Sequence, residues 1–385
     1  MSIDSGMGMQ ADRKFLFLYL NTGAGHISAA KVLASAMKER QESVEIKMLN
    51  GFSKRKFGHV LFEKFYNYAC NYIPGAFPLV YELGQHRWFQ TGLKHFLAPE
   101  TRRYLRKMVL RERPTDIVSF HFAITPYVRD VLQNIPWTVR FTVVVTDPFT
   151  VPHCWFWARD VRYLVYSPEA KAVAVKECGV PERNVEIIPF LMNQKFRDPV
   201  SPEEVLALRR KHNFAPDKKV VLLVGGGEGL PGALEIVNRC ILHRANFAVA
   251  VVCGRDKVKR KNLTILGKMH RSLDLHVFGF VDFLDELVKI CDCAVIKAGP
   301  ATLMEMLSCR KPVIICKYIH NQELGNMRFA VGNNVGYFIR KPADIFRKIN
   351  ELLNDSAFDE KMRHRFDSVA IDTDASKVAE LLLRS

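Results

Sequence analysis

The chain has 385 residues, 48% of them hydrophobic and 25% charged, which excludes a disordered or fibrous protein and leaves room for two ordinary domains. Its formal net charge of +16 predicts an anionic partner, whether a nucleic acid, an acidic membrane surface or a phosphorylated substrate. Its nine cysteines are odd in number and form no CxxC pair, which argues against a disulfide framework and a zinc site.

Short apolar runs of β-strand character alternate with longer helical patterns in the first half of the chain. These runs are 15–20, 44–49, 117–120, 141–145 and 163–165. The alternation is typical of βαβ units and a parallel sheet. The first run is too short for a signal-peptide core, and no stretch approaches the roughly 18 to 20 apolar residues of a membrane span. Any membrane contact is therefore expected to be peripheral.

Residues capable of acid–base chemistry follow three of these runs. His26 stands in the turn TGAGH after the first run, His121 follows the third, and Asp147 follows the fourth. General-base chemistry is expected at the carboxyl ends of parallel strands. We predict His26 as the base, because its unperturbed pKa of about 6.5 lies close to working pH. A lone histidine is more often structural, and Asp147 either competes as a base, if buried, or orients the histidine.

Aromatic and basic residues are mixed in the region 52–113, between the second and third apolar runs. This region holds twelve Lys and Arg against four Glu. Such a mixture suits a surface that attracts anionic headgroups and buries apolar groups at the interface. The residues predicted to meet the acceptor lipid and the membrane are Trp88, Arg102, Arg103, Arg106 and Lys107. The alternative is a solvated basic face over core aromatics.

A polar, proline-containing stretch at 197–219 separates the first half from a second series of apolar runs. This second series is 220–224, 247–252, 276–278, 294–296 and 313–316. We predict two Rossmann-like α/β domains with parallel sheets, 1–197 and 198–385, with the last helix packing back on the first domain. Both domains open with a strand, a glycine turn and a helix, so both turns are expected to face one interdomain cleft, as in the GT-B architecture.

A glycine-rich loop follows the first strand of the second domain. It comprises Gly225, Gly226, Gly227, Glu228 and Gly229, and we place Pro231 in the first turn of the next helix. Glycines let a backbone approach a ligand closely, and N–H groups at a helix start favour phosphate oxygens. Gly227, Gly229 and Gly232 also satisfy GxGxxG, the nicotinamide dinucleotide pattern, but the next strand ends without the acid that would bind a ribose.

Two further constellations follow later strands of the second domain. In KAGPATLME, Gly299 and Thr302 stand at a helix start that favours an anion, and Glu305 can accept hydrogen bonds from two vicinal hydroxyls of a ribose. For Glu305 alone, a solvated helix face is the commoner explanation. In HNQELGN, Gln322, Glu323 and Asn326 can read sugar hydroxyls, although singly they make an ordinary polar loop.

Five segments in order, TGAGH, TDPFTVPHCW, GGGEG, KAGPATLMEML and NQELGN, resemble the monogalactosyldiacylglycerol synthase and processive diacylglycerol glucosyltransferase family. That family is related to the transferase that adds N-acetylglucosamine to the peptidoglycan lipid precursor. The resemblance spans about residues 14–345. It implies a GT-B fold, a UDP-sugar bound mainly by the C-terminal domain, a membrane lipid acceptor met by the N-terminal domain, and inversion at the anomeric carbon.

The resemblance also assigns roles to individual residues. It places the diphosphate on Gly225 to Gly229 and Thr302, the ribose on Glu305 and the uracil on Phe280, with the sugar on Gln322, Glu323 and Asn326. It turns His26 toward the acceptor hydroxyl. The chain departs from the usual pattern at Ala24, at Leu230 with Pro231, and at Asn321, where a glycine commonly precedes the glutamine.

The sequence therefore predicts an inverting transferase that moves a hexose from a UDP-sugar to diacylglycerol or a glycosyl-diacylglycerol. We expect it in the cytoplasm, bound peripherally to the anionic inner face of the cell membrane, without an essential metal or other cofactor. Asp372 and Asp374 lie away from every predicted strand end and make no convincing metal motif. The alternatives are N-acetylglucosamine transfer to a polyprenyl-diphosphate lipid, an NAD-dependent oxidoreductase without its ribose acid, and a nucleic-acid-binding protein without a recognition module.

Overall fold

The computed structural model describes residues 13–20, 24–52, 86–319, 321–369 and 371–384, with the backbone alone described at 24, 87–90 and 93–98. Contacts divide the chain into two compact units. Unit 1 comprises Met1–Thr146, Val151–Pro189 and Asp374–Ser385, and unit 2 comprises Asp147–Thr150 and Phe190–Thr373. Each unit contains a six-stranded parallel sheet, which confirms the predicted α/β class with two Rossmann-like sheets.

The sheet of unit 1 has the strand order β2-β1-β3-β4-β5-β6. Its strands are β1 (Lys14–Tyr19), β2 (Glu45–Asn50), β3 (Asp116–Ser119), β4 (Arg140–Val144), β5 (Arg162–Val165) and β6 (Val185–Ile187). Its main helices are α1 (Ala24–Arg40), α5 (Arg87–Glu112), α6 (Thr125–Leu132), α7 (Pro168–Ala172) and α16 (Ala375–Arg384). Because β2 and β3 flank β1, the strand order reverses beside β1, and the carboxyl ends of β1 and β3 form the expected ligand-binding edge.

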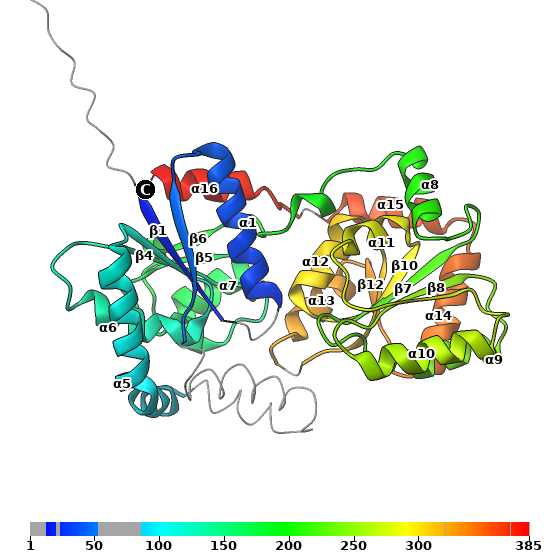
Figure 1. Cartoon of the computed structure of the whole chain (residues 1–385), viewed down its shortest axis with the longest axis horizontal. Coiled ribbons are helices and arrows are strands. Elements are labelled where there is room, and N and C mark those ends of the chain that lie inside the picture. The colour runs from blue at the N-terminus through cyan, green and yellow to red at the C-terminus, as the bar shows by residue number, and fades with distance from the viewer. Residues whose placement is uncertain (1–12, 21–23, 53–85, 320, 370, 385) are drawn as a thin grey trace, which may run out of the picture. The chain divides into compact units, whose positions relative to one another are not determined.

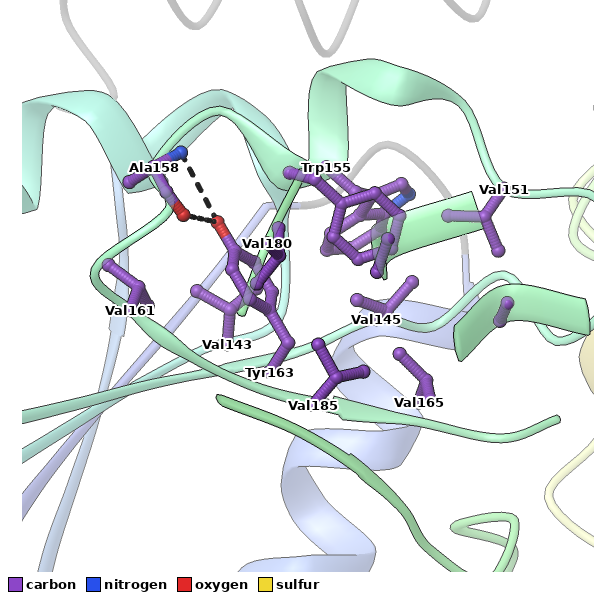
Figure 2. Close-up of a cluster of buried hydrophobic side chains, with 13 residues drawn as sticks. Val143, Val145, Val151, Trp155, Ala158, Val161, Tyr163, Val165, Val180 and Val185 are labelled. Atoms are coloured by element: carbon purple, nitrogen blue, oxygen red, sulfur yellow. Dashed lines mark hydrogen bonds between the residues drawn. The ribbon is translucent and has the colours of Figure 1, made fainter. Parts of the chain in front are cut away.

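Figure 2 shows part of the core of unit 1, where side chains of β4 and β5 pack with Trp155. Tyr163 and Trp155 are fully buried with Val143, Val145 and Val165. The Tyr163 hydroxyl donates to the carbonyl oxygen of Ala158 at 2.8 Å, so its polar atom is satisfied inside the core. Continuous apolar strands of this kind are expected where helices cover both faces of a parallel sheet.

The C-terminal helix α16 belongs to unit 1, where it lies beside α1 (Figure 1). Arg40 at the end of α1 forms an ion pair with Glu380 at 3.0 Å. Arg13, just before β1, donates to the carbonyl oxygen of Leu383 at 2.6 Å and pairs with Asp116 at the same distance. The two ends of the described chain are therefore joined within one unit.

The sheet of unit 2 has the strand order β12-β11-β10-β7-β8-β9. Its strands are β7 (Val220–Val224), β8 (Ala248–Val252), β9 (Leu275–Phe278), β10 (Cys293–Lys297), β11 (Val313–Lys317) and β12 (Gly336–Phe338). Its helices are α8 (Pro202–Lys211), α9 (Ala233–Leu242), α10 (Lys257–Met269), α11 (Leu284–Ile290), α12 (Pro300–Ser308), α13 (Leu324–Gly332), α14 (Pro342–Asn354) and α15 (Phe358–Asp367). The order reverses between β7 and β10, so the segments after these two strands form the expected ligand site.

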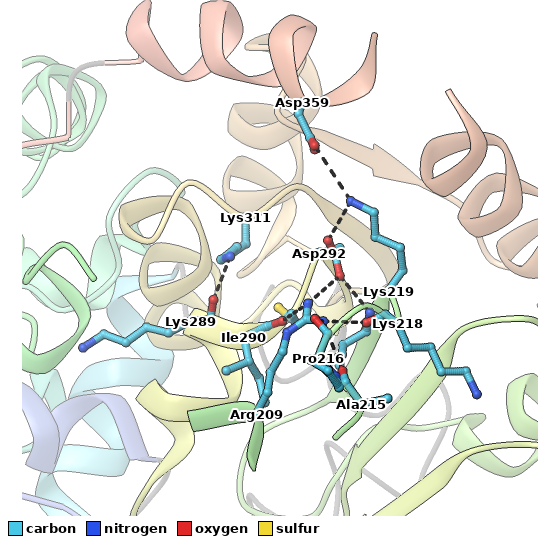
Figure 3. Close-up of polar contacts among 12 residues, drawn as sticks. Arg209, Ala215, Pro216, Lys218, Lys219, Lys289, Ile290, Asp292, Lys311 and Asp359 are labelled. Atoms are coloured by element: carbon cyan, nitrogen blue, oxygen red, sulfur yellow. Dashed lines mark hydrogen bonds and ion pairs between the residues drawn. The ribbon is translucent and has the colours of Figure 1, made fainter. Parts of the chain in front are cut away.

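A buried arginine ties α8 to the start of β7 (Figure 3). The Arg209 guanidinium donates to the main-chain carbonyl groups of Ala215, Pro216, Lys218 and Ile290. It also lies 3.5 Å from Asp292, whose carboxylate accepts the backbone N–H of Val220 at 2.7 Å. These bonds satisfy loop carbonyl groups that burial would otherwise leave without partners.

Within the described ranges, no helix is long and apolar enough to cross a bilayer. Over the same ranges, no three His, Cys, Asp or Glu side chains are grouped so that they could hold a metal ion.

Candidate active site

His26 lies in the first turn of α1, beside the carboxyl ends of β3 and β4. Its Nδ1 atom is 2.9 Å from the carbonyl oxygen of Phe120 and 2.7 Å from the hydroxyl oxygen of Thr146. A carbonyl oxygen can only accept a hydrogen bond, so Nδ1 carries the proton when it bonds Phe120. This tautomer leaves Nε2 as the nitrogen that can accept a proton.

His121 adjoins His26 but makes a local structural bond. The two ring centroids are 4.6 Å apart, and the His121 ring stacks on Phe122 at 4.5 Å. Nδ1 of His121 accepts the backbone N–H of Ala123 at 3.2 Å, and so caps the short turn that follows β3. Trp155 lies 6.2 Å from His26 and 6.3 Å from His121, centroid to centroid, so the pair has aromatic surroundings.

The electrostatics of the histidine pair correct one sequence-based expectation. Although residue His26 is partly exposed, burial of its ring lowers its pKa to about 4, and the bond to Phe120 only partly offsets this. Burial likewise lowers the pKa of His121 well below its ordinary value, and the charge of His26 adds to the effect. The expected pKa of about 6.5 for His26 is therefore wrong. His26 is neutral at pH 7 but is a weaker base than expected.

Asp147 is buried, with 7% exposure, so it meets the condition for competing as a base. It opens the segment Asp147–Thr150, which belongs to unit 2 and not to the first domain as predicted from composition. Phe149 of this segment stacks on Phe329 of α13 at 4.3 Å, and the Thr150 hydroxyl accepts the N–H of Gly325 at 2.7 Å.

The glycine loop after β7 folds back on itself. Gly226 and Gly229 adopt left-handed φ values of 78° and 70°, and the Gly229 N–H donates to the carbonyl oxygen of Gly226 at 3.1 Å. A Cβ atom on Gly225 would stand 2.5 Å from the Gly229 carbonyl oxygen. Glycine is therefore required here by turn geometry and by close approach. Gly226 and Glu228 are exposed, which leaves part of the loop open to a ligand.

The loop after β8 supports the glycine loop, a feature missed from the sequence. The N–H of Arg255 donates to the carbonyl oxygen of Gly227 at 2.8 Å, and Lys259 donates to that of Glu228 at 2.8 Å. A Cβ atom on Gly254 would clash with the Gly227 carbonyl oxygen. The sequence signal for this support is Gly254, the glycine that follows the second strand of the second domain. The helix α9 begins at Ala233 after Gly232, so the prediction that Pro231 lies in its first turn is wrong.

The segment after β10 presents a helix start and an unpartnered acid. Gly299 precedes α12 and Thr302 lies in its first turn, with no side-chain cap on its free N–H groups. Glu305 is partly exposed, yet burial and, to a lesser extent, the nearby carboxylate of Asp285 together raise its pKa to about 7. Within the described residues, the side chain of Glu305 forms no hydrogen bond or ion pair.

The third constellation brings two of its residues into the protein interior. Asn326 is 1% exposed, and its amide nitrogen donates to the carbonyl oxygen of Ala298 at 2.8 Å. Its Oδ1 atom is buried and has no partner in the described part of the chain. Glu323 is 4% exposed, and its two oxygens already meet Lys297 at 3.1 Å and the N–H of Ile319 at 2.7 Å.

Glu323 is therefore paired inside the protein, and no sequence pattern predicts Lys297 as its partner. Gln322 is partly exposed beside it. Asn321 has a left-handed φ of 65°. Asparagine is the residue that best replaces glycine in this conformation, which explains the departure from the family pattern at this position.

The N-termini of α9, α12 and α13 all follow strands of unit 2 and lack side-chain caps. The N-terminus of α10, by contrast, is capped by Asp256, which accepts the N–H of Lys259. Uncapped helix starts favour anions through their free N–H groups and the helix dipole. Phe280, just after β9, is 66% exposed, and the Arg255 guanidinium lies 5.4 Å from its ring centroid. An exposed aromatic ring offers a stacking face.

The predicted membrane region is described only in part. The segment 53–85 and the side chain of Trp88 lie outside the described residues. Along α5, Arg103, Arg106 and Lys107 are exposed, and Arg102 pairs with Asp130 at 2.7 Å. The opposite face of α5, including Leu105 and Val109, belongs to the core of unit 1. The structure of this part of α5 agrees with the alternative interpretation, a solvated basic face over a buried apolar face.

Known proteins match both halves of the chain. Residues 26–189 match the family model of monogalactosyldiacylglycerol (MGDG) synthase, and residues 205–372 match that of the glycosyl transferases group 1. A probable chloroplastic MGDG synthase of Glycine max is 26% identical over 383 residues, covering 92% of this chain and 68% of that protein. A processive diacylglycerol beta-glucosyltransferase of Bacillus cereus is 26% identical over 372 residues, covering 96% of this chain and 93% of that protein.

The fold also matches solved structures. The crystal structure of Anabaena Alr3699/HepE in complex with UDP-glucose is similar with a TM-score of 0.60 and 11% identity, covering 96% of this chain and 99% of that one. At this identity the likeness shows the fold alone. The order of the two family matches along one chain agrees with the order of the two units. The chain is a GT-B glycosyltransferase whose first half matches the MGDG synthase family model and whose relatives include MGDG synthases and processive diacylglycerol glucosyltransferases.

Proposed function

We propose that this enzyme transfers a hexose from a UDP-sugar to diacylglycerol, or to a glycosyl-diacylglycerol, at a membrane surface. The names of the relatives support diacylglycerol as the acceptor, and the UDP-glucose bound to the Anabaena protein supports the donor class. The observation that carries the proposal is the partly buried carboxyl of Glu305, which has no side-chain partner in the described structure and whose surroundings raise its pKa.

An ionised carboxyl that is partly buried without a hydrogen-bond donor or a cation is costly, and a ligand can supply the missing partner. The two vicinal hydroxyls of a ribose supply the missing donors. Glu305 also lies on α12, whose uncapped N-terminus follows β10 at the point where the strand order reverses. A nucleoside diphosphate satisfies both features at once, because its phosphates meet the helix start while its ribose meets the acid.

The remaining donor contacts follow from the same edge of unit 2. The starts of α9 and α12 and the glycine loop bind the diphosphate, and Phe280 stacks on the uracil. Gln322 and the unpartnered Oδ1 of Asn326 read sugar hydroxyls. We revise the role of Glu323, whose oxygens already hold Lys297 and Ile319, and propose that it positions the loop in front of α13.

In the proposed reaction, the acceptor hydroxyl attacks the anomeric carbon from the face opposite UDP. Nε2 of His26 takes the hydroxyl proton as the new carbon–oxygen bond forms. The bond between the anomeric carbon and the phosphate oxygen breaks, and its electron pair leaves with UDP. The N-termini of α9 and α12 stabilise the charge of the departing diphosphate. The product is therefore inverted at the anomeric carbon.

We also propose that the donor binds without a metal, because helix N-termini and backbone N–H groups can neutralise the diphosphate in place of a cation. A titration of UDP-glucose in the presence of a chelator tests this point. Unchanged affinity is expected, and loss of all binding would contradict it.

We propose a peripheral location at the cytoplasmic face of the cell membrane, where an anionic leaflet attracts the basic face of α5. Sedimentation of the protein with anionic and neutral vesicles tests the attraction. Binding that does not depend on anionic lipid would contradict it.

Ligand-induced stabilisation separates the proposal from its alternatives, because a ligand of the folded state raises the unfolding temperature. We expect UDP to raise it, and NAD and a single-stranded oligonucleotide to leave it unchanged. Stabilisation by NAD alone would favour an oxidoreductase. A second assay offers UDP-glucose, UDP-galactose and UDP-N-acetylglucosamine with diacylglycerol or a polyprenyl-diphosphate lipid. Transfer only of N-acetylglucosamine to the polyprenyl lipid would replace the proposed acceptor.

A further inference from the structure

The helix α10 of unit 2 exposes large apolar side chains to solvent. Val258 is 70% exposed, Ile265 46% and Met269 71%. They stand at positions i, i+7 and i+11, so at 3.6 residues per turn they share one narrow strip of the helix.

This strip points away from the body of unit 2. Leu263 on the same helix is fully buried, and a Cβ atom on Gly267 would stand 3.2 Å from Leu275 at the start of β9. At 100° per residue these two positions lie on the side of α10 opposite to Val258. A helix that faces only water on its outer side is expected to be most polar there. The outer side of α10 carries the apolar strip instead.

Basic side chains accompany the strip, and α10 contains no acidic residue. Its exposed basic side chains are those of Lys257, Arg260, Lys261 and Lys268, and Arg271 follows the helix. The acid nearest in sequence, Asp256, caps the helix and pairs with Lys259 at 3.1 Å. We call the set Val258, Ile265, Met269, Lys257, Lys261 and Lys268 the α10 surface.

The α10 surface differs from the described part of α5 in a way that matters for lipid binding. A helix that lies in a membrane interface needs cationic groups for the headgroups and apolar groups for the acyl boundary. The described part of α5 exposes charge and a single large apolar side chain, Leu110, while the rest of its apolar face is buried in unit 1. The α10 surface exposes both kinds of group on one helix.

We infer that the α10 surface binds an anionic lipid membrane, with Val258, Ile265 and Met269 inserted at the headgroup boundary. The inference rests on the proposed function in one respect, that the acceptor is a membrane lipid. A second copy of the chain is a poor occupant, because a two-fold contact would set the lysines of one helix against those of the other. A nucleic acid would use the lysines but would leave the apolar strip without a role.

Sedimentation of the full chain with vesicles tests the inference. An apolar variant carries Val258→Ser, Ile265→Ser and Met269→Ser, and a charge variant carries Lys257→Glu, Lys261→Glu and Lys268→Glu. With phosphatidylcholine vesicles containing phosphatidylglycerol, each variant should lose at least roughly tenfold in binding. High salt should remove the difference between the charge variant and the wild type, while the loss in the apolar variant persists.

Two control variants test whether vesicle binding depends on the position of the substitutions in α10 or only on the loss of exposed apolar or basic groups. Leu206→Ser with Leu242→Ser removes exposed apolar groups from α8 and α9, which expose these leucines by 39% and 68%. Arg210→Glu, Arg239→Glu and Arg347→Glu change the net charge by the same amount as the charge variant but at exposed sites on other helices. Both controls should retain more vesicle binding than the α10 variants. Equal losses in the α10 variants and their controls would overturn the inference.

Two further readouts keep this inference distinct from the proposed function. Transfer to diacylglycerol dissolved in detergent micelles, and stabilisation by UDP, should be the same in both α10 variants as in the wild type. If the wild type transfers sugar to micellar lipid but the α10 variants bind vesicles as well as the wild type does, only the role of α10 is overturned. A wild type with no transfer in micelles removes the proposed function. The lipid assignment would also be overturned if the apolar variant lost self-association or oligonucleotide binding but kept its vesicle binding.

Discussion

In the proposed donor site, Glu305 is a group that titrates near neutral pH. Burial and the charge of Asp285 raise its pKa to about 7, so both protonation states are populated there. The ionised form accepts hydrogen bonds from both ribose hydroxyls, so affinity should rise as the pH rises through this value. Between pH 6 and pH 8 we expect UDP-glucose affinity to increase about tenfold, as the ionised fraction does. UDP-glucose suits this titration because its phosphates carry no second ionisation near pH 7.

Calorimetric titrations of UDP-glucose at pH 6 and pH 8 check this prediction. Glu305→Gln should abolish the pH dependence, and Glu305→Ala should weaken UDP binding by about 1 to 3 kcal/mol. Unchanged UDP affinity in a folded Glu305→Ala variant would remove this residue from the site.

His26 as the general base predicts a loss of rate without a loss of donor affinity. His26→Ala should lower turnover by about 10² to 10⁴ while UDP-glucose binding stays nearly constant. Burial lowers the folded-state pKa of His26 to about 4, so protonation should inactivate the base only in that region. At saturating UDP-glucose, where the titration of Glu305 no longer limits donor binding, the acid limb of kcat should therefore have its midpoint well below the ordinary histidine value of about 6.5.

Steady-state rates from pH 4.5 to pH 8 measure that limb. A midpoint at the ordinary histidine value would show that the ring is solvated in the working enzyme. Near-normal turnover in His26→Ala would pass the role to Asp147 or His121, and collapse of donor affinity would place His26 in the phosphate site instead.

Residue types could be predicted at this site better than their bonding partners. His26, Glu305 and Asn326 stand directly after strands or glycine turns, and the topology of a parallel sheet collects such positions at one edge. Main-chain partners such as the Phe120 carbonyl, and the pairing of Lys297 with Glu323, depend on packing between segments that no local pattern reports. The pKa of His26 was mispredicted for the same reason, because the ring's burial comes from those segments.

At the scale of elements, the apolar runs predicted the central strands closely. β7 was predicted with its observed bounds, and the other predicted runs fell within about a residue or two of a strand, as is usual at element ends. The two strands that were missed, β6 and β12, have three residues each and lie at the edges of their sheets. A strand this short gives no periodicity, and its pairing depends on a neighbour far along the chain.

The glycine loop offers a matched pair of substitutions. Gly229 has a left-handed φ of 70°, and a Cβ atom there would stand 2.8 Å from the Cys253 carbonyl oxygen. Gly227 has no positive φ, and the nearest side-chain atom to its Cβ position, on Arg255, is 3.9 Å away. Gly229→Ala should reduce the free energy of unfolding by about 1 to 3 kcal/mol, and Gly227→Ala by less than about 0.5 kcal/mol. Urea unfolding measures both, and equal losses would contradict the loop conformation.

The basic face of α5 should act on membranes mainly through charge, since Leu105 and Val109 are buried in unit 1 and Leu110, 41% exposed, is its one exposed large apolar side chain among the described residues. Neutralising Arg102, Arg103, Arg106 and Lys107 together should reduce binding to anionic vesicles at low salt and leave binding to neutral vesicles nearly unaffected. Vesicle sedimentation at two salt concentrations measures this effect. A variant that still sediments fully with anionic vesicles would show that α5 is only a solvated face.

At the scale of the whole molecule, alternation of strands and helices sufficed to predict two parallel α/β sheets. It could not predict that Asp147–Thr150 belongs to unit 2, whereas the return of the last helix, α16, to unit 1 was expected. These assignments rest on contacts between distant residues, such as Phe149 with Phe329 and Arg13 with Leu383. Contacts at such sequence separations leave no periodic signal in the chain.

The central claim is that this glycosyltransferase makes an inverted glycolipid from a UDP-sugar and diacylglycerol. The most direct test incubates the protein with radiolabelled UDP-glucose or UDP-galactose and diacylglycerol in anionic vesicles, and determines the anomeric configuration of the lipid product by NMR. The donor sugars are α-linked to UDP, so a β-linked glycosyl-diacylglycerol is predicted, and Glu305→Ala and His26→Ala should each reduce its formation. An α-linked product would contradict the single displacement. Absence of any labelled lipid with both donors would contradict the central claim.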